Sequence, residues 1–410
     1  SEAMARVTIY ANAARTLAEL KCTFDRHGPL MLPRLLPVTN LETPALLGLA
    51  ESAPLARRLQ LARLVAGLLK TRPDLSSGHS IAALARSLAD LMQEMQTEGL
   101  TADALEGIDT GDHARHWQNA LVFLRIAARF HLADPAMDRA ARQRLASEAL
   151  LQDWSQGRNL PDGPVIVVGS TGSHGATRLF MEAVAALPEG AVVLPGFDFD
   201  QPPAVWDGLD AVEDHPQARF APLIRTLGRP ARWTDTPPPV PGRNRLVSLA
   251  LRPAPVTDQW IAEGPRLPDL IAPTQGLTLI EADQPGQEAE VIALLLRDAA
   301  ERESRATLIA ADGNLIRRVT AVLDRWRLCP DESGGQPLSL TGHGLFLRHI
   351  AALFGEALGI DRLLVLLKHP MAITGSPLVG ANEARLLARD LELELRRNGP
   401  AFPDGECLRD

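Results

Sequence analysis

A glycine-rich loop at residues 169–175, which reads Gly-Ser-Thr-Gly-Ser-His-Gly, is the segment of this chain best suited to meet a phosphate group. It follows an apolar run at residues 165–168 and precedes a helical spacing of apolar residues. Backbone N–H groups at such strand-to-helix turns bind phosphates in many α/β proteins. A nucleotide-binding loop also needs a lysine, and this loop has none. We therefore expect a tight structural turn, whose backbone N–H groups at the start of the helix could still meet one phosphate of a nucleic-acid backbone.

Two further polar clusters follow predicted strands. Residues 197–201, Phe-Asp-Phe-Asp-Gln, come after an apolar run, and their carboxylates and amide could position water or contact a ligand at the carboxyl edge of a sheet. The alternative is an acidic loop that is merely solvated. Asp312, Asn314 and Arg317 follow a predicted strand at residues 306–310. They could contact a polyanion, or they could belong to a solvated helix face.

Other kinds of chemistry find little support in the sequence. Ser170 and His174 lack the Gly-x-Ser-x-Gly turn of a serine nucleophile. The three cysteines have neither metal-ligand nor disulfide spacing, which favours a reducing cytoplasm, and His113 with His116 has no third ligand nearby, so we predict no metal site. No apolar run approaches the roughly 18 residues of a membrane span. The net charge of −8 weighs against a protein that coats nucleic acid in general, although local basic patches are present.

The order of the elements predicts an α/β fold with two parallel-sheet cores. Strands are expected at residues 7–10, 35–39, 165–168, 191–194, 277–281 and 306–310. Leucines at helical spacing between the second and third of these predict a helical insertion that splits the first core. The predicted domains are residues 1–50 plus 155–275 for the first core, 51–154 for the insertion, 276–355 for the second core, and 356–410 for the start of a second helical region.

A proline-rich stretch at residues 202–273 follows the last predicted strand of the first core. It contains three tryptophans, Trp206, Trp233 and Trp260, which a disordered linker rarely holds. We therefore expect an ordered, irregular connector that packs its tryptophans.

Several strings of this sequence resemble the AddB family, the B subunits of bacterial AddAB helicase–nucleases that repair double-strand breaks. They are VTIYANAARTLAEL, LLPVTNL, VIVVGSTGSHGATRLFMEAVAALPEGAVVLPGFD, ATLIAADGNLIRRVTAVLDRW, PDESGGQPLSLT and LLKHP. The likeness runs in order over nearly the whole chain, and its most specific part is residues 165–198. The resemblance implies two RecA-like cores of the superfamily 1 helicase type, each with an inserted helical domain.

The resemblance also implies roles for particular residues. Those that match positions touching the DNA backbone are Asn12, Arg15 and Thr39, with Ser170, Thr171, Asp312, Asn314 and Arg317 as further candidates. Those that match a degenerate nucleotide site are Gly169, Asp198, Asp200 and Gln201. Gly169 to Thr171 stand where an active helicase has acidic residues, and residues 197–201 stand where it has a Gly-Asp-x-x-Gln sensing loop. Hydrolysis of ATP with magnesium is therefore not expected, and none of these residues is predicted to be catalytic.

In the family, an AddA-type subunit carries the ATP-driven motor, while the B subunit helps to guide single-stranded DNA and in some members reads a Chi-type sequence. A nuclease domain with an iron–sulfur cluster lies toward the family's carboxyl terminus, and we expect this chain to end before it. We therefore expect no cofactor here, since ATP and magnesium belong to the partner. The expected partners are an AddA-type subunit and single- or double-stranded DNA ends in the cytoplasm, without a membrane. Two alternatives stay open: an active ATP-dependent DNA helicase or translocase, and a scaffold that binds protein only.

Overall fold

The structure is a computed structural model, and the chain in it divides into two compact units, Ser1–Thr278 and Leu279–Asp410, called unit 1 and unit 2 below. The residues that the structure describes are 2–27, 31–76, 78–101, 122, 137–209, 212, 214–267, 269–355, 358–373 and 380–403. His113 and His116, considered above as metal ligands, lie outside the described residues.

A four-stranded parallel sheet in the order β2-β1-β3-β4 forms the centre of unit 1. Its strands are β1 (Thr8–Ala11), β2 (Arg34–Pro37), β3 (Val165–Val168) and β4 (Gly190–Val193). In the register, Ile9 of β1 lies opposite Leu35 on one side and Ile166 on the other. Strands far apart in the sequence thus pair directly, and the predicted α/β class with a parallel sheet is confirmed.

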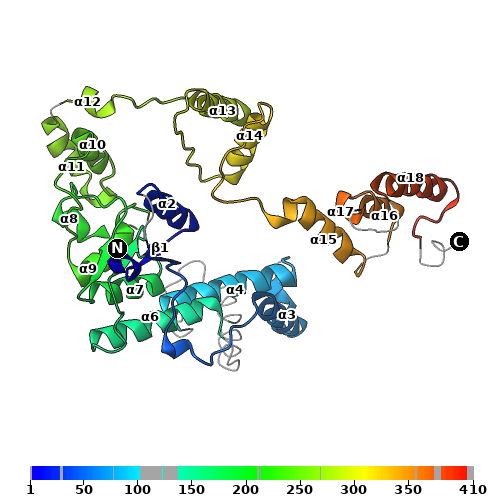
Figure 1. Cartoon of the computed structure of the whole chain (residues 1–410), viewed down its shortest axis with the longest axis horizontal. Coiled ribbons are helices and arrows are strands. Elements are labelled where there is room, and N and C mark those ends of the chain that lie inside the picture. Colours follow the sequence, from blue (N-terminus) through cyan, green and yellow to red (C-terminus); the bar gives the residue numbers. More distant parts are fainter. Residues whose placement is uncertain are drawn as a thin grey trace. The chain divides into compact units, whose positions relative to one another are not determined.

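Two helices connect neighbouring strands of this sheet. α2 (Ala14–Asp25) links β1 to β2, and α7 (Gly175–Ala185) links β3 to β4. The two connections run outward in opposite directions, so right-handed crossovers place α2 and α7 on opposite faces. Figure 1 shows α2 above β1 and α7 below it. The strand order therefore reverses between β1 and β3, and such a switch point is where α/β proteins usually bind ligands.

The core of unit 1 is centred on Phe180 of α7, which is fully buried. Its ring meets that of Tyr10 on β1 at 4.9 Å, edge to face, and that of Trp154 at 6.2 Å. Burying a large apolar side chain of this kind stabilises the fold by about 1.5–3 kcal/mol. Burial also raises the pKa of the Tyr10 hydroxyl, against an opposing effect of Arg34. The hydroxyl therefore stays protonated at neutral pH.

Three long helices flank this core. α3 (Pro54–Thr71) and α4 (Ile81–Glu98) pack through a cluster that includes Leu61, Val65 and Met92. α6 (Arg139–Ser155) packs against both α4 and α7, and it carries Trp154 into the sheet core. The helical insertion is thus joined to the sheet through α6.

Shorter elements complete unit 1. They are α1 (Glu2–Ala5), η1 (Pro44–Leu46), η2 (Pro73–Ser76), α8 (Pro203–Trp206), η6 (Ala218–Phe220), α9 (Ala221–Leu227), α10 (Pro241–Ala250), η7 (Ala254–Val256), α11 (Asp258–Glu263), η8 (Gly264–Arg266) and α12 (Ile271–Thr274). Of the three tryptophans in the proline-rich stretch, Trp206 stacks on Phe197, Trp260 is half exposed, and Trp233 is exposed by 84%. The prediction that the connector packs its tryptophans is therefore wrong for Trp233, which lies where the chain forms neither helix nor strand.

The described part of unit 2 is helical (Figure 1). Its elements are α13 (Pro285–Glu301), α14 (Gly313–Asp324), η9 (Leu338–Leu340), α15 (Gly342–Ala352), α16 (Ile360–Leu367), α17 (Pro370–Ile373) and α18 (Ala381–Asn398). α13 and α14 pack against each other through two alanines of the first helix and Val319 and Leu323 of the second. α16 and α18 form a second pair.

The two strands predicted at residues 277–281 and 306–310 are wrong. Neither segment is paired as a strand, since every strand that the structure describes belongs to the sheet of unit 1. Leu279 is exposed by 85% and Ile309 by 92%. An apolar run becomes a strand only when a neighbouring strand takes its backbone hydrogen bonds, and these segments have no such neighbour in the part of the chain that the structure describes. The second parallel-sheet core is therefore not formed by the described residues.

Candidate functional site

The loops that follow β1 and β3 meet at the switch point of the sheet. Gly169 has a φ of +77°, and a Cβ placed on it would lie 3.0 Å from Asn12 Oδ1. Glycine is favoured here because it adopts this backbone conformation without strain and leaves room for the Asn12 amide. Asn12 is exposed and accepts a hydrogen bond from the Thr16 hydroxyl at 3.2 Å. These two predicted residues are therefore neighbours at the carboxyl edge.

The polar side chains of the glycine-rich loop serve the loop itself. Ser170 is buried, and its hydroxyl accepts a hydrogen bond from the Gly172 N–H at 3.3 Å. Thr171 is half-buried beside it. The buried hydroxyl of Ser170 thus fixes the turn, which agrees with the structural interpretation of this loop.

The amino end of α7 is occupied by a carboxylate from another helix. Glu98, the last residue of α4, accepts a hydrogen bond from the Gly175 N–H at 2.7 Å. A carboxylate at this position satisfies a free backbone donor and the positive end of the helix dipole. Glu98 therefore already takes the anion position at this N–H, and contact of the turn with a phosphate stays a prediction.

The remaining predicted DNA contacts of unit 1 lie on neighbouring elements. Thr39 follows β2, and its hydroxyl accepts a hydrogen bond from Arg139 Nη2 of α6 at 3.0 Å. Arg15 is exposed on α2. The edge therefore presents small polar groups and one guanidinium from α2.

The loop after β4, residues 196–201, is fixed by ring stacking and by hydrogen bonds from residues later in the chain. Phe197 stacks on Trp206 at 4.9 Å with an interplanar angle of 7°. Gln217 accepts a hydrogen bond from the Asp198 N–H at 2.9 Å and donates one to the Gly196 carbonyl at 3.0 Å. Arg229 donates to the carbonyl of Gln201 at 3.1 Å. The loop is thus fixed by both its backbone and its rings.

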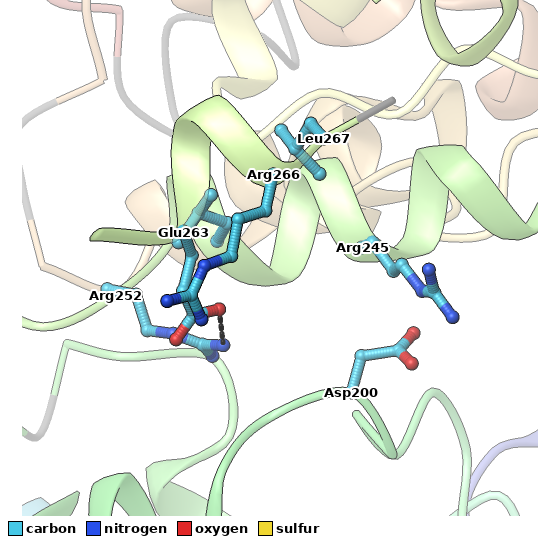
Figure 2. A pocket seen from close by; sticks show the side chains of 7 residues that line it. Asp200, Arg245, Arg252, Glu263, Arg266 and Leu267 are labelled. Atoms are coloured by element: carbon cyan, nitrogen blue, oxygen red, sulfur yellow. Dashed lines mark ion pairs between the residues drawn. The ribbon is translucent and has the colours of Figure 1, made fainter. Parts of the chain in front are cut away.

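The three polar side chains predicted in this loop have different roles. The Asp198 carboxylate accepts a hydrogen bond from the Asp200 N–H at 2.9 Å, so it closes a turn. Gln201 is exposed by only 2%, and its Nε2 has no hydrogen-bond partner. Asp200 is exposed, and its carboxylate points away from this turn into the pocket of Figure 2. Of the predicted remnant, only Asp200 is available to a ligand.

Sequence reasoning missed the residues that support this loop. Gln217 belongs to the string Asp-His-Pro-Gln at residues 214–217, whose His215 is buried and bridges to the Leu251 carbonyl at 2.8 Å. The histidine and glutamine on either side of a proline were the one local signal in the sequence for residues that support a loop. No local pattern connects Arg229 to the loop, because it lies 28 residues beyond Gln201.

The predicted set in unit 2 is a local cap of α14. Asp312 is the N-cap, and its carboxylate accepts a hydrogen bond from the Asn314 N–H at 2.8 Å. Arg317 donates to the Asn314 side chain, one helical turn away. These exposed groups bind one another, as N-cap residues commonly do.

Within the described residues, no three His, Cys, Asp or Glu side chains lie close enough together to hold a metal ion. No helix in the part of the chain that the structure describes is long and apolar enough to cross a membrane. Comparison with protein-family models and with curated proteins found no match to this chain.

Proposed function

We propose that this chain is the helicase-like, ATPase-inactive part of an AddB-type subunit that acts in double-strand break repair. It guides single-stranded DNA and docks on an AddA-type motor subunit. The proposal rests on the sequence resemblance together with one structural observation: in the loop after β3, where an active helicase has acidic residues, the Ser170 hydroxyl closes the turn instead. Residues 169–175 of this loop contain no carboxylate that could hold magnesium. ATP hydrolysis therefore belongs to the partner.

The proposal takes unit 1 as a RecA-like core. Its parallel sheet and the switch point between β1 and β3 support this assignment. A second RecA-like core at residues 276–355 stays part of the proposal, supported by the sequence resemblance and by the pairing of α13 with α14. The exposed groups Asn12 and Thr39, at the carboxyl edge of unit 1, would meet the DNA backbone.

One observation favours a second candidate, a scaffold that binds protein only. In unit 2, Leu279, Ile309 and Phe354 are exposed by 85%, 92% and 88%. Large apolar side chains in such number at a surface are typical of protein contacts. They fit docking on a motor subunit equally well, so DNA binding decides between the two.

Two measurements test the proposal on the full chain mixed with the AddA-type protein. Fluorescence anisotropy with a labelled oligothymidine should show that Asn12→Ala lowers DNA affinity up to about tenfold, since one hydrogen bond contributes about 0.5–1.5 kcal/mol. Asn382→Ala, an exposed asparagine on α18, should leave it unchanged. ATP hydrolysis by this chain alone, stimulated by DNA, would instead support an active motor. If the AddA-type protein binds DNA with the same affinity whether or not this chain is present, the result would support the scaffold.

A further inference from the structure

A pocket of about 270 Å³ lies in unit 1, beside the loop that follows β4. Three arginines and two carboxylates dominate its lining: Arg245, Arg252, Arg266, Asp200 and Glu263. They come from α10, the residues after it, η8, the β4 loop and α11. Figure 2 shows Arg252, Glu263 and Arg266 gathered on one side and Arg245 near Asp200 on the other.

The side chain of Arg252 is buried in the wall of this pocket with its hydrogen bonds incomplete. Its side chain is exposed by only 2%. Nη1 donates to the Ser248 hydroxyl at 3.1 Å, and Nη2 lies 3.8 Å from a Glu263 oxygen. Its Nε is buried and has no partner. A guanidinium is charged at neutral pH and has five donors, so burying it in this state is costly unless an anion lies nearby.

The other two arginines of the pocket, Arg245 and Arg266, are exposed. Neither Arg245 nor Arg266 makes an ion pair or hydrogen bond with the residues that the structure describes. Asp200 and Arg245 approach in Figure 2 without forming an ion pair. Three guanidinium groups against two carboxylates leave an excess of one positive charge in the pocket. The site can therefore accept an anion.

We propose that this pocket binds a phosphate group, either an internucleotide phosphate of single-stranded DNA or a free phosphate. One guanidinium group can donate two parallel hydrogen bonds to the oxygens of a phosphate. Three guanidinium groups from different elements therefore suit an anion with several oxygens. Small-molecule sites usually measure roughly 300–1,000 Å³. This pocket is slightly smaller, so it has room for a phosphate group and few further atoms. The inference goes beyond the proposed function, because it needs neither a motor partner nor the switch-point residues.

Three variants of the full chain test the pocket by calorimetric titration with inorganic phosphate at constant ionic strength. Arg245→Gln combined with Arg266→Gln should weaken binding at least tenfold. Both side chains are exposed, so the fold should persist, as circular dichroism can verify. Asp200→Asn should strengthen binding several-fold, because it removes a repelling charge from the lining. Arg219→Gln, an exposed arginine of η6 outside the pocket, should change it less than twofold.

A second titration identifies the source of the phosphate. Oligothymidine that competes with inorganic phosphate, and loses affinity in the double variant, supports a DNA phosphate. Inorganic phosphate that binds while oligothymidine does not compete supports a free phosphate and takes this pocket out of the DNA path. Unchanged phosphate affinity in the double variant, or no phosphate binding at all, overturns the inference. If the complex with the motor still binds DNA in that case, the proposed function stands without this pocket.

Discussion

Residues 165–185 and 306–324 share one sequence pattern, an apolar run, a short polar loop and an amphipathic helix, yet only the first contains a strand. Val165 and Val167 are exposed by 3% and 1%, and their strand pairs on both sides. Ile309 is exposed by 92% and pairs with nothing that the structure describes. The helices α7 and α14 form in both. A helix closes its own hydrogen bonds, whereas a strand depends on neighbours, and the comparison shows this difference within one chain.

The largest expected effect concerns the core beneath β3. Phe180→Ala should lower the free energy of unfolding by about 3–5 kcal/mol, because it leaves a cavity between Tyr10 and Trp154. Urea denaturation followed by tryptophan fluorescence measures it. Phe354→Ala, the same change at a residue exposed by 88% in unit 2, should stay within about 0.5 kcal/mol. Equal losses at both positions would contradict the assignment of the core to unit 1.

A second pair of variants tests the two apolar runs directly. Val167→Thr places a hydroxyl in the sheet core and should cost about 1–3 kcal/mol. Ile309→Thr should change stability by less than about 0.5 kcal/mol, because that side chain is already in water. A loss of more than 1 kcal/mol at Ile309 in the same denaturation assay would show that residues 306–310 are buried after all, as the sequence suggested.

The sequence was sufficient for elements whose stabilising contacts are local or strongly patterned. Apolar runs and glycine-rich turns located β1, β2, β3 and β4 to within one or two residues, and helical spacing indicated α7 and the insertion that contains α3 and α4. It failed at residues 277–281 and 306–310 because pairing partners are set by the tertiary fold. The same limit applies to Trp233, whose exposure depends on what else packs nearby.

The candidate site was predictable where its residues directly follow predicted parallel strands. The proximity of Asn12 and Gly169 followed from strands that end at one edge of the sheet. Glu98 lies 77 residues before Gly175. Arg252 and Asp200 line one pocket, but several helices separate them in the sequence. No sequence motif therefore predicts that either pair lies close together. A buried arginine also has no sequence signature, because burial of a charge is decided by the surroundings.

A smaller effect tests the carboxylate at the start of α7. Glu98→Gln should lower the free energy of unfolding by about 0.5–2 kcal/mol, since a neutral amide interacts more weakly with the helix dipole and the Gly175 N–H. Glu94→Gln, an exposed glutamate on the same helix, supplies the control and should be nearly neutral. Thermal melting compares the two. No difference between them would mean that the stability of α7 does not depend on this contact. The start of α7 would then be stabilised locally, as the start of α14 is by its own N-cap, Asp312.

The smallest effect concerns the pairing of two described helices of unit 2, α16 and α18. Hydrogen bonds from Lys368 and Arg396 lower the pKa of the Glu392 carboxyl below its usual range. The bond from Lys368, the residue that follows α16, also joins α16 to α18. A lowered folded-state pKa gives stability that is fully present above the ordinary glutamate pKa of about 4.3 and is lost as the pH falls through the folded value. Helical circular dichroism during thermal melting should therefore show a modest decrease in melting temperature between pH 6 and pH 3. Glu392→Gln should remove that part of the decrease, while Asp390→Asn on the same helix should keep it. An acid dependence that survives Glu392→Gln would place it elsewhere in the chain, and unit 2 would then owe its helix pairing to its apolar contacts, as unit 1 does.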